Sequence, residues 1–341
     1  MSPSVKFSIP ALAENISRLR QAQPESACWV PEIRTGIPHE CLLQILSAFQ
    51  QLPADSEIRL GSLNVQQAVQ LSQSPVLQQS GRPLRWLITS PISSLADAAL
   101  LAQLLQSCDA TVVADHFRHL ELASLAAKTG GRPAGILIDV DTGQHLTGAC
   151  PGPDTAALAR AIPELAGIKL EGLFSALHSI TTPEHLLAEQ ILSAVQICQH
   201  CQRMIQGSQI QCSEVFLDYV PSSVLPAFPG TGFLNSPFLI PPQSLAIHGT
   251  PIALTAEVLS RPSLDHCVVN AGSLLLHDSP EHVRVTVPGG GSVVRLFPDH
   301  AVLHLTSEAM DLRIGDQVQL WSPSLHHHSA SLSDVAVLER S

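Results

Sequence analysis

Short apolar runs alternate with longer stretches of helical periodicity over the first two-thirds of the chain. The short runs predict strands at residues 28–34, 57–62, 85–90, 110–115, 135–141, 170–178, 214–220 and, from a weaker pattern, 228–234. Apolar positions spaced three and four apart predict helices at residues 39–52, 93–106, 116–128, 154–162 and 184–204. Strand and helix in alternation indicate parallel βα units, and eight such units predict an α/β fold, the (β/α)8 or TIM barrel.

The pattern changes after about residue 240. The segments that follow are short and rich in β-branched residues, at positions 252–261, 266–272, 282–287, 292–297, 301–306 and 316–322. They predict a mostly antiparallel β domain. We therefore place a barrel domain at residues 1–240 and a C-terminal β domain at residues 241–341, and we expect a short strand within residues 1–10 to pair with the second domain. The glycine run Pro288–Ser292 has no helix after it, which predicts a hairpin turn rather than a phosphate loop.

Charge and composition narrow the class of protein. The 341 residues carry 18 basic and 29 acidic side chains, a formal net charge of -11, so nucleic acid and anionic membrane surfaces are unfavourable partners. No apolar run approaches the roughly 18 residues of a membrane helix, and the first residues lack the pattern of an export signal. We expect a cytoplasmic protein whose eight cysteines are reduced, buried thiols, and we interpret Cys198 and Cys201 as ordinary helix residues.

Candidate functional residues follow from the barrel prediction, because such barrels carry their working residues at the carboxyl ends of the strands. The residues at those ends are Arg34, Thr35, Ser62, Asn64, Thr89, Ser90, Asp115, Asp141, His178, Tyr219, Ser222 and Ser223. The chain has only three lysines, Lys6, Lys128 and Lys169, and none falls at such an end. The predicted mouth is therefore polar but lacks a side-chain amine.

The order and spacing of several segments resemble the pyridoxal-phosphate enzymes of the alanine-racemase fold, and within them the D-threonine aldolase and D-serine dehydratase branch. VPEIRTGIPHE is similar to the family's R-P-H-x-K-T-H-K strand, ILIDVDTGQHLTGA to E-V-D-x-G-x-x-R-x-G, and CVVNAGS to V-x-D-A-G-S. The resemblance covers most of the chain. It implies the barrel with its C-terminal β domain, a homodimer and a small, amino-acid-like ligand.

This resemblance breaks at the cofactor. The family lysine, which forms a Schiff base with the cofactor aldehyde, corresponds to Arg34 in this sequence. A guanidinium stays protonated and has no free lone pair on nitrogen, so it cannot form that bond. Arg34 instead either forms an ion pair with Asp141 or Glu32 or binds an anionic ligand. The other family positions that contact the cofactor are also changed, and they correspond to Leu146, Ala176, Leu177 and Pro221.

Three polar positions keep the family pattern. His178 is either an imidazole that lines the pocket or a hydrogen-bonded core histidine. Asp139 and Asp141 share one face of their strand, and we prefer to interpret them as structural carboxylates that bind loop amides near Gly143. A phosphate-bearing ligand, if one binds, would meet the residues after the seventh strand, Tyr219, Ser222 and Ser223.

The closing stretch carries a partial match to the family's metal-binding P-x-H-x-C motif. Those ligands fall on residues 324–327, and the chain has His326, His327 and His328 in place of the histidine–cysteine pair. Imidazoles are good zinc ligands, and His300, which matches the family's E-E-H-G, is the candidate that joins them. The alternative is a solvated cluster of histidines without a metal.

Two hypotheses of function follow. In the first, the chain is a degenerate family member that cannot form a pyridoxal-phosphate aldimine and has a binding or regulatory role, or a rebuilt mouth that uses Arg34, His178 and Asp141. In the second, it is an aldolase or dehydratase that depends on pyridoxal phosphate and a divalent metal such as zinc, and acts on D-3-hydroxy amino acids through another amine. Whether the protein is an enzyme stays open; if it is, the resemblance implies an amino-acid lyase or a racemase-like enzyme.

Overall fold

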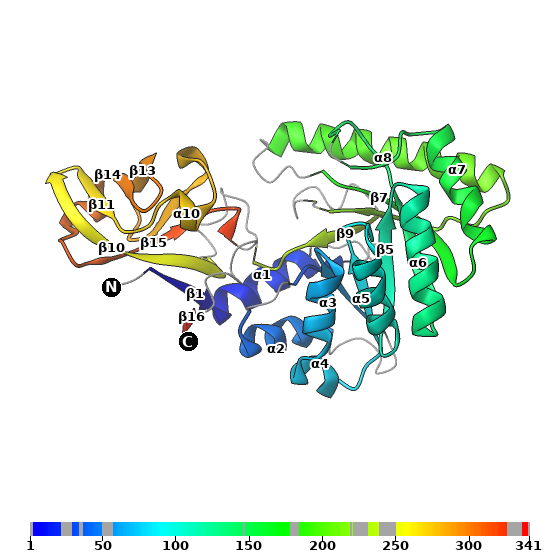
Figure 1. The fold of residues 1–341 in the computed structure, drawn as a ribbon. Helices are drawn as coiled ribbons and strands as arrows, with labels where there is room; N and C mark the ends of the chain where they lie inside the picture. Colours follow the sequence, from blue (N-terminus) through cyan, green and yellow to red (C-terminus); the bar gives the residue numbers. More distant parts are fainter. Residues whose placement is uncertain are drawn as a thin grey trace. The chain divides into compact units, whose positions relative to one another are not determined.

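The computed structural model describes residues 3–21, 29–33, 37–49, 57–145, 147–177, 184–218, 220, 231–238, 250–325 and 336–339. The chain divides into two compact units, coloured along the sequence in Figure 1. The first, which we call the sheet unit, comprises Met1–Ser17, Thr35–Ala48 and Ser236–Ser341; the second, the barrel unit, comprises Arg18–Arg34 and Phe49–Asn235. The predicted domain boundary at residue 240 falls outside the described residues and stays a prediction.

The barrel unit is built on eight parallel strands among the described residues, which confirms the predicted (β/α)8 fold. Along the sheet they follow the order β2-β9-β8-β7-β6-β5-β4-β3. A bridge between Glu32 and Gly61, beside a 2.9 Å hydrogen bond from the Ile33 N–H to the Gly61 carbonyl, joins the two edge strands. The strands are β2 (Trp29–Pro31), β3 (Ile58–Ser62), β4 (Leu84–Ile88), β5 (Asp109–Ala114), β6 (Ala134–Asp139), β7 (Ile168–Ser175), β8 (Glu214–Leu217) and β9 (Thr231–Asn235).

Helices connect these strands, and some begin at a clear capping residue. The Ser94 hydroxyl accepts from the Asp97 N–H while the Asp97 carboxylate accepts from the Ser94 N–H, a capping box. Asn64 caps its helix through the Gln67 N–H. No helix of the described chain is both long and apolar enough to cross a membrane. The helices are α3 (Val65–Ser72), α4 (Pro75–Gln79), α5 (Leu95–Leu105), α6 (Phe117–Gly130), α7 (Pro153–Ala161) with the 3-10 turn η1 (Ile162–Glu164), and α8 (Glu184–Gly207).

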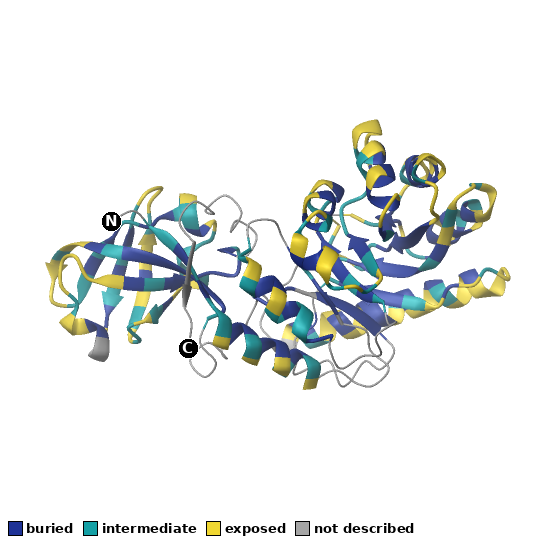
Figure 2. Cartoon of the chain, turned by 90° about the horizontal axis from the view of Figure 1, so that it is seen from below, coloured by how far each residue is buried: buried dark blue, intermediate teal, exposed yellow. Residues whose placement is uncertain are grey.

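Alternation along the strands places every second side chain inside the barrel. The middle of the lumen is filled by one apolar side chain from each strand except β3, namely Val30, Leu87, Val113, Leu137, Phe174, Phe216 and Leu234. On β3, Gly61 leaves the space that Leu234 occupies, because an added Cβ would lie 2.1 Å from the Leu234 side chain. The lumen is therefore a packed core, and Figure 2 shows the strands mostly in the colour of buried residues.

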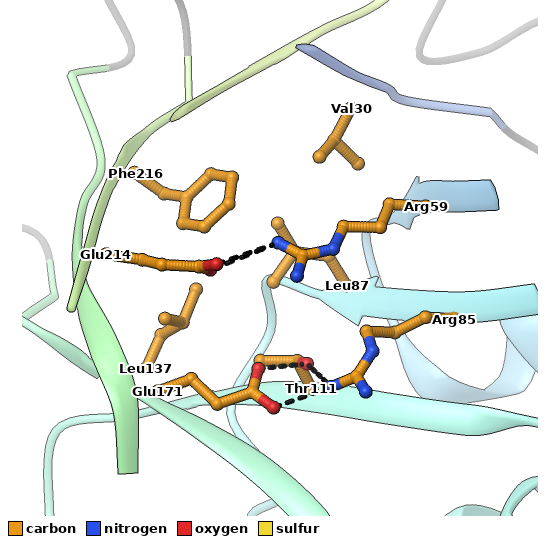
Figure 3. A pocket seen from close by; sticks show the side chains of 9 residues that line it. All are labelled: Val30, Arg59, Arg85, Leu87, Thr111, Leu137, Glu171, Glu214 and Phe216. Carbon is orange, nitrogen blue, oxygen red and sulfur yellow. Dashed lines mark hydrogen bonds and ion pairs between the residues drawn. The ribbon is translucent and has the colours of Figure 1, made fainter. Parts of the chain in front are cut away.

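Near the amino ends of the strands, the interior side chains are charged (Figure 3). Arg59 on β3 donates to Glu214 on β8 at 3.1 Å, and Arg85 on β4 donates to Glu171 on β7 at 2.5 Å. Around the barrel, β2 and β9 lie between β3 and β8, and β5 and β6 lie between β4 and β7. Both ion pairs therefore cross the lumen. Glu57 accepts from both arginines and links the pairs into one charged layer.

The sheet unit contains the predicted, mostly antiparallel sheet. The long strand β10 (Ile252–Ser263) pairs along one edge with β15 and along the other with β1 and then β11. The strands β11, β14, β13, β12 and β15 pair in that order, and β10 pairs with both β11 and β15. These six strands therefore form a closed sheet. The other strands are β1 (Ser4–Ser8), β11 (His266–Val269), β12 (Arg284–Val287), β13 (Gly291–Leu296), β14 (Ala301–Leu305), β15 (Gln317–Trp321) and β16 (Ala336–Glu339).

Two features of this sheet concern its hairpin turn and its edge strands. β12 and β13 are antiparallel neighbours with Arg284 opposite Ser292, so the glycine run between them is a hairpin turn, as predicted. β1 pairs with β10 and with β16, so the first strand belongs to this sheet, whereas β16 itself was not predicted. The remaining helical segments are α1 (Ile9–Gln21), within which the division between the units falls, α2 (His39–Ser47), α10 (Ser273–Leu276), and the 3-10 turns η4 (Pro280–His282) and η5 (Ser307–Asp311).

Double-mutant cycles test the charged layer. For Arg85→Met and Glu171→Met we expect a coupling of about 1–3 kcal/mol in the free energy of unfolding, because their side chains are only 23% and 17% exposed. Arg118 and Glu121 on α6, each 56% exposed, form the control pair, with an expected coupling of about 0.3 kcal/mol. Denaturant unfolding measures both. Equal couplings for the two pairs would mean that the charged layer does not hold the barrel together.

Candidate functional site

A polar layer lies at the carboxyl ends of the barrel strands, beyond the apolar core. Two residues after the core position of β4, β5, β6 and β8, the alternation points polar side chains inward: Thr89, Asp115, Asp139 and Asp218. Asp139 is 2% exposed and pairs in register with the core residue Phe174. The described part of the barrel mouth is therefore acidic.

Asp115 ties two mouth loops together. Its carboxylate lies 2.9 Å from His119 Nδ1, one turn into α6, and accepts from the Gly148 N–H at 3.0 Å in the loop after β6. His119 lowers the pKa of Asp115 below the usual carboxyl range, Gly148 adds to this, and burial acts against it. Gly148 has a φ of +106°, and an added Cβ would lie 2.4 Å from the Asp141 nitrogen, so this loop requires glycine there.

Asp141 closes the same loop on itself. Its Oδ1 accepts from the N–H groups of Gly143 and His145 at 2.9 and 3.1 Å, and its Oδ2 lies 2.7 Å from His145 Nδ1. Burial raises the pKa of Asp141, but the hydrogen bonds outweigh burial and the net shift is downward. These contacts fit the preferred interpretation of Asp141 as a structural carboxylate that binds loop amides; a catalytic role for it stays a prediction.

Hydrogen bonds also fix the ends of β7 and β8. The hydroxyl oxygens of Thr142 and Ser175 lie 2.7 Å apart, and the Leu177 N–H donates to Asp218 Oδ1 at 2.6 Å. Ala176 packs against the apolar core, and Leu177 is buried. The polar groups of the described mouth thus connect the ends of β5, β6, β7 and β8 to one another and to the loop after β6.

All three lysines are described, and none lies at the carboxyl end of a barrel strand. Lys169 is the second residue of β7, which ends at Ser175; at about 3.3 Å per residue, it is about 20 Å from that end of the strand. Lys128 is in the last turn of α6, and in these barrels the helices run back toward the amino ends of the strands. Lys6 is in β1 of the sheet unit.

Many of the other predicted site residues lie outside the described part of the chain: Arg34, His178, Tyr219, Ser222, Ser223, His326, His327 and His328. His300 is described, and its Nδ1 lies 2.7 Å from Asp299 while its ring stacks on Phe297 with centroids 4.4 Å apart. Within the described residues, no group of three or more histidine, cysteine or acidic side chains is arranged so that it could hold a metal ion. The metal site at the histidine triplet therefore stays a prediction.

The described cysteines are free thiols. Cys198 and Cys201 are buried on α8, and burial raises the pKa of the Cys198 thiol, which fits their interpretation as ordinary helix residues. Cys150 is exposed, so the prediction that the thiols are buried was wrong at this position. Cys150 lies in the loop before α7. A single cysteine in a loop belongs to no periodic apolar pattern, so the sequence does not indicate whether it is buried.

Sequence reasoning missed the histidine partners of the mouth carboxylates. Asp115 and His119, and likewise Asp141 and His145, are four residues apart, and this spacing was the signal that the sequence offered. The contact of Asp218 with the Leu177 backbone joins two different strands. No local pattern contains it, because it depends on the register between β7 and β8.

Hydrogen exchange tests the role of Asp115. In Asp115→Asn, we expect the Gly148 amide to exchange about tenfold faster, because one charge-assisted hydrogen bond worth about 1.5 kcal/mol is weakened. Asp109→Asn, at the other end of β5 in an exposed ion pair with Arg132, is the control and should leave Gly148 protected. Unchanged exchange in Asp115→Asn would rule out the loop-anchoring role.

The same measurement has a pH dependence. Because the folded pKa of Asp115 is depressed, its stabilisation is complete above the unfolded value of about 3.9 and is lost as pH falls through the folded value. Protection of Gly148 in the unsubstituted protein should therefore persist at about pH 4 and fall only in stronger acid. Loss of protection between pH 6 and pH 5 would contradict the depressed pKa.

Comparisons with known proteins agree with this architecture. Residues 8–219 match the family model of the alanine racemase N-terminal domain, and no curated protein matches the sequence. The structure of D-threonine aldolase from Filomicrobium marinum aligns with a TM-score of 0.78 at 16% identity, over 97% of this chain and 90% of that chain. D-threo-3-hydroxyaspartate dehydratase from Delftia sp. HT23 aligns with 0.73 at 13%, over 99% and 94%. An alanine-racemase-like protein from Idiomarina loihiensis aligns with 0.72 at 13%, over 99% and 94%.

Proposed function

The chain belongs to the family of the alanine racemase N-terminal domain, and we propose that it is a degenerate member that does not hold pyridoxal phosphate through an aldimine. In this proposal the barrel mouth binds a small, amino-acid-like molecule instead of running the family's cofactor chemistry. The observation that carries the proposal is the position of the three lysines, none of which follows the end of a barrel strand.

An aldimine requires an unprotonated primary amine within reach of the cofactor aldehyde. Lys169 is about 20 Å along its strand from the mouth, a distance that no lysine side chain spans. Lys128 belongs to the same end of the barrel as Lys169, and Lys6 belongs to the sheet unit. The residues present therefore do not fit a covalently held pyridoxal phosphate.

The charges expected at the mouth support an amino-acid-like ligand. Arg34, at the family lysine position, supplies a permanent positive charge suited to a carboxylate. Asp139 is a buried carboxylate on the inner face of β6 and is suited to an ammonium group. Ala176, which packs against the apolar core, offers an apolar surface to a small side chain. A homodimer and a cytoplasmic location, implied by the resemblance and the composition, stay predictions.

The alternative function is a lyase that acts on D-3-hydroxy amino acids with pyridoxal phosphate and a divalent metal. The likeness to D-threonine aldolase and to D-threo-3-hydroxyaspartate dehydratase favours it. Such a lyase needs an amine that the described residues of the mouth do not supply. Its metal would be bound by His326, His327, His328 and His300. Because one fold hosts many reactions, likeness at 13% to 16% identity weighs less than the lysine positions.

Borohydride trapping separates the two functions. We expect the purified protein, incubated with pyridoxal phosphate, to show no aldimine absorbance and, after reduction, no stoichiometric phosphopyridoxyl adduct by intact mass, because none of the three lysines stands at the carboxyl end of a barrel strand. Sparse labelling of exposed Lys169 is the background, and Lys169→Arg measures it. One adduct per chain on a single lysine, abolished when that lysine becomes arginine, would establish the alternative.

Restoring the amine alone should not restore the cofactor site. We expect Arg34→Lys to bind pyridoxal phosphate about 100-fold more weakly than Arg34→Lys combined with Leu146→Arg and Pro221→Gly. The combined variant returns a partner to the ring hydroxyl and an N–H donor to the phosphate turn, each worth about 1–2 kcal/mol. Titration of the aldimine band measures both affinities. Equal affinities would mean that the rest of the pocket is intact and that only the lysine was lost.

A further inference from the structure

A ring of inward-facing side chains lies directly beyond the apolar core, toward the carboxyl ends of the barrel strands. Each member stands two residues after a core residue of the same strand, so strand alternation points it into the lumen. Glu32, after Val30, is also bridged in register to Gly61 and shares its inward face. The ring, which we call the mouth ring, comprises Glu32, Thr89, Asp115, Asp139, Ala176 and Asp218. It has four carboxylates and no basic side chain.

The rest of this end of the barrel does not balance the mouth ring. The segments that leave β2 to β8 at their carboxyl ends are residues 32–34, 63–64, 89–94, 115–116, 140–152, 176–183 and 218–230. Outside the ring they add one carboxylate, Asp141, and one arginine, Arg34. His119 and His145, which contact Asp115 and Asp141, add positive charge only when they are protonated. The mouth therefore has five carboxylates, the four of the ring and Asp141, against one guanidinium.

The packed core increases the energetic effect of this imbalance. Asp139 is 2% exposed, and the apolar side chains of Leu137 and Phe174 fill the lumen beneath the ring. Charges beside packed apolar groups interact through a lower effective dielectric than charges in water, and a cleft lined by charges of one sign attracts the opposite sign. The carboxylates of the ring are all described, and no three of them are arranged so that they could hold a metal ion. The counter-charge that fits the mouth is therefore an organic cation.

We propose that the ligand of the mouth is an amino acid with a second, basic group, and that it carries a net positive charge. This inference rests on the proposed function, because it takes the mouth as the ligand site. Arg34 pairs with the α-carboxylate and Asp139 with the α-ammonium group. The side-chain cation then lies toward the remaining carboxylates of the ring, with Asp218 on β8 as the one we test. An acidic amino acid is disfavoured, because its second carboxylate meets like charge.

Titration calorimetry with matched amino acids tests the charge of the ligand. Ornithine and norvaline have the same number of carbons and differ in the terminal ammonium group, and both enantiomers of each are used. We expect ornithine to bind at least about tenfold more tightly than norvaline, because it makes one more charge-assisted contact, and aspartate to bind more weakly than norvaline. Raising the salt concentration from about 0.05 M to about 0.5 M should reduce the preference for ornithine.

Two isosteric variants test the mouth ring itself. Asp139→Asn and Asp218→Asn each remove a charge, and the amide oxygen at position 218 still accepts from the Leu177 N–H. We expect each variant to lower the ratio of the ornithine and norvaline affinities at least about threefold, whereas a folding defect would weaken both ligands together. Asp109→Asn, at the amino end of β5 in an exposed ion pair with Arg132, is the matched control and should leave the ratio unchanged.

Equal affinities for ornithine and norvaline, or tighter binding of aspartate, would overturn this inference and leave the proposed function standing, since an amino-acid-like ligand still binds. An unchanged affinity ratio in both ring variants would also overturn it. If none of the three amino acids binds, the inference fails together with the amino-acid-like ligand. A single-lysine adduct in the trapping experiment overturns the proposed function whichever amino acid binds most tightly.

Discussion

The closed barrel depends on the apolar layer that fills its lumen. Seven strands each contribute one large side chain, and Gly61 on the eighth leaves room for Leu234. This layer keeps water from the middle of the barrel, so the ion pairs beneath it act in a medium of lower dielectric than bulk water. Partial burial also favours pairing, because an unpartnered charge in such a position loses part of its hydration. The apolar core and the charged layer therefore stabilise the closed barrel together.

The groups that stabilise the barrel lie apart from the carboxyl ends of the strands, where such barrels carry their functional residues. The charged layer spans β3 to β8 and β4 to β7, and it encloses β2, which is only three residues long. The ion pair between β3 and β8 thus connects the strands on the two sides of β2 and β9, and it helps to keep the short β2 in the barrel. At the opposite end, Asp115, Asp141 and Asp218 hold loops through backbone N–H groups. The mouth can change its reacting groups while these contacts keep its shape.

The sequence predicted what depends on local pattern. All eight barrel strands were found, including the weak one that became β9, because apolar alternation is a property of a few neighbouring residues. The hairpin at Pro288–Ser292 was predicted for the same reason. The cross-lumen pairs were not, because Arg59 and Glu214 are 155 residues apart and meet only through the barrel's closure.

Under the proposed function, the fold persists in this chain without the family's reaction. The groups that hold the barrel closed lie in its middle and at the amino ends of its strands, whereas family chemistry needs one amine at the carboxyl ends. Under the proposed function, a guanidinium in place of that amine would leave the cross-lumen ion pairs and the loop anchors described above in place. The fold is shared with D-threonine aldolase at a TM-score of 0.78 and 16% identity, so the packing that defines it tolerates extensive change of sequence.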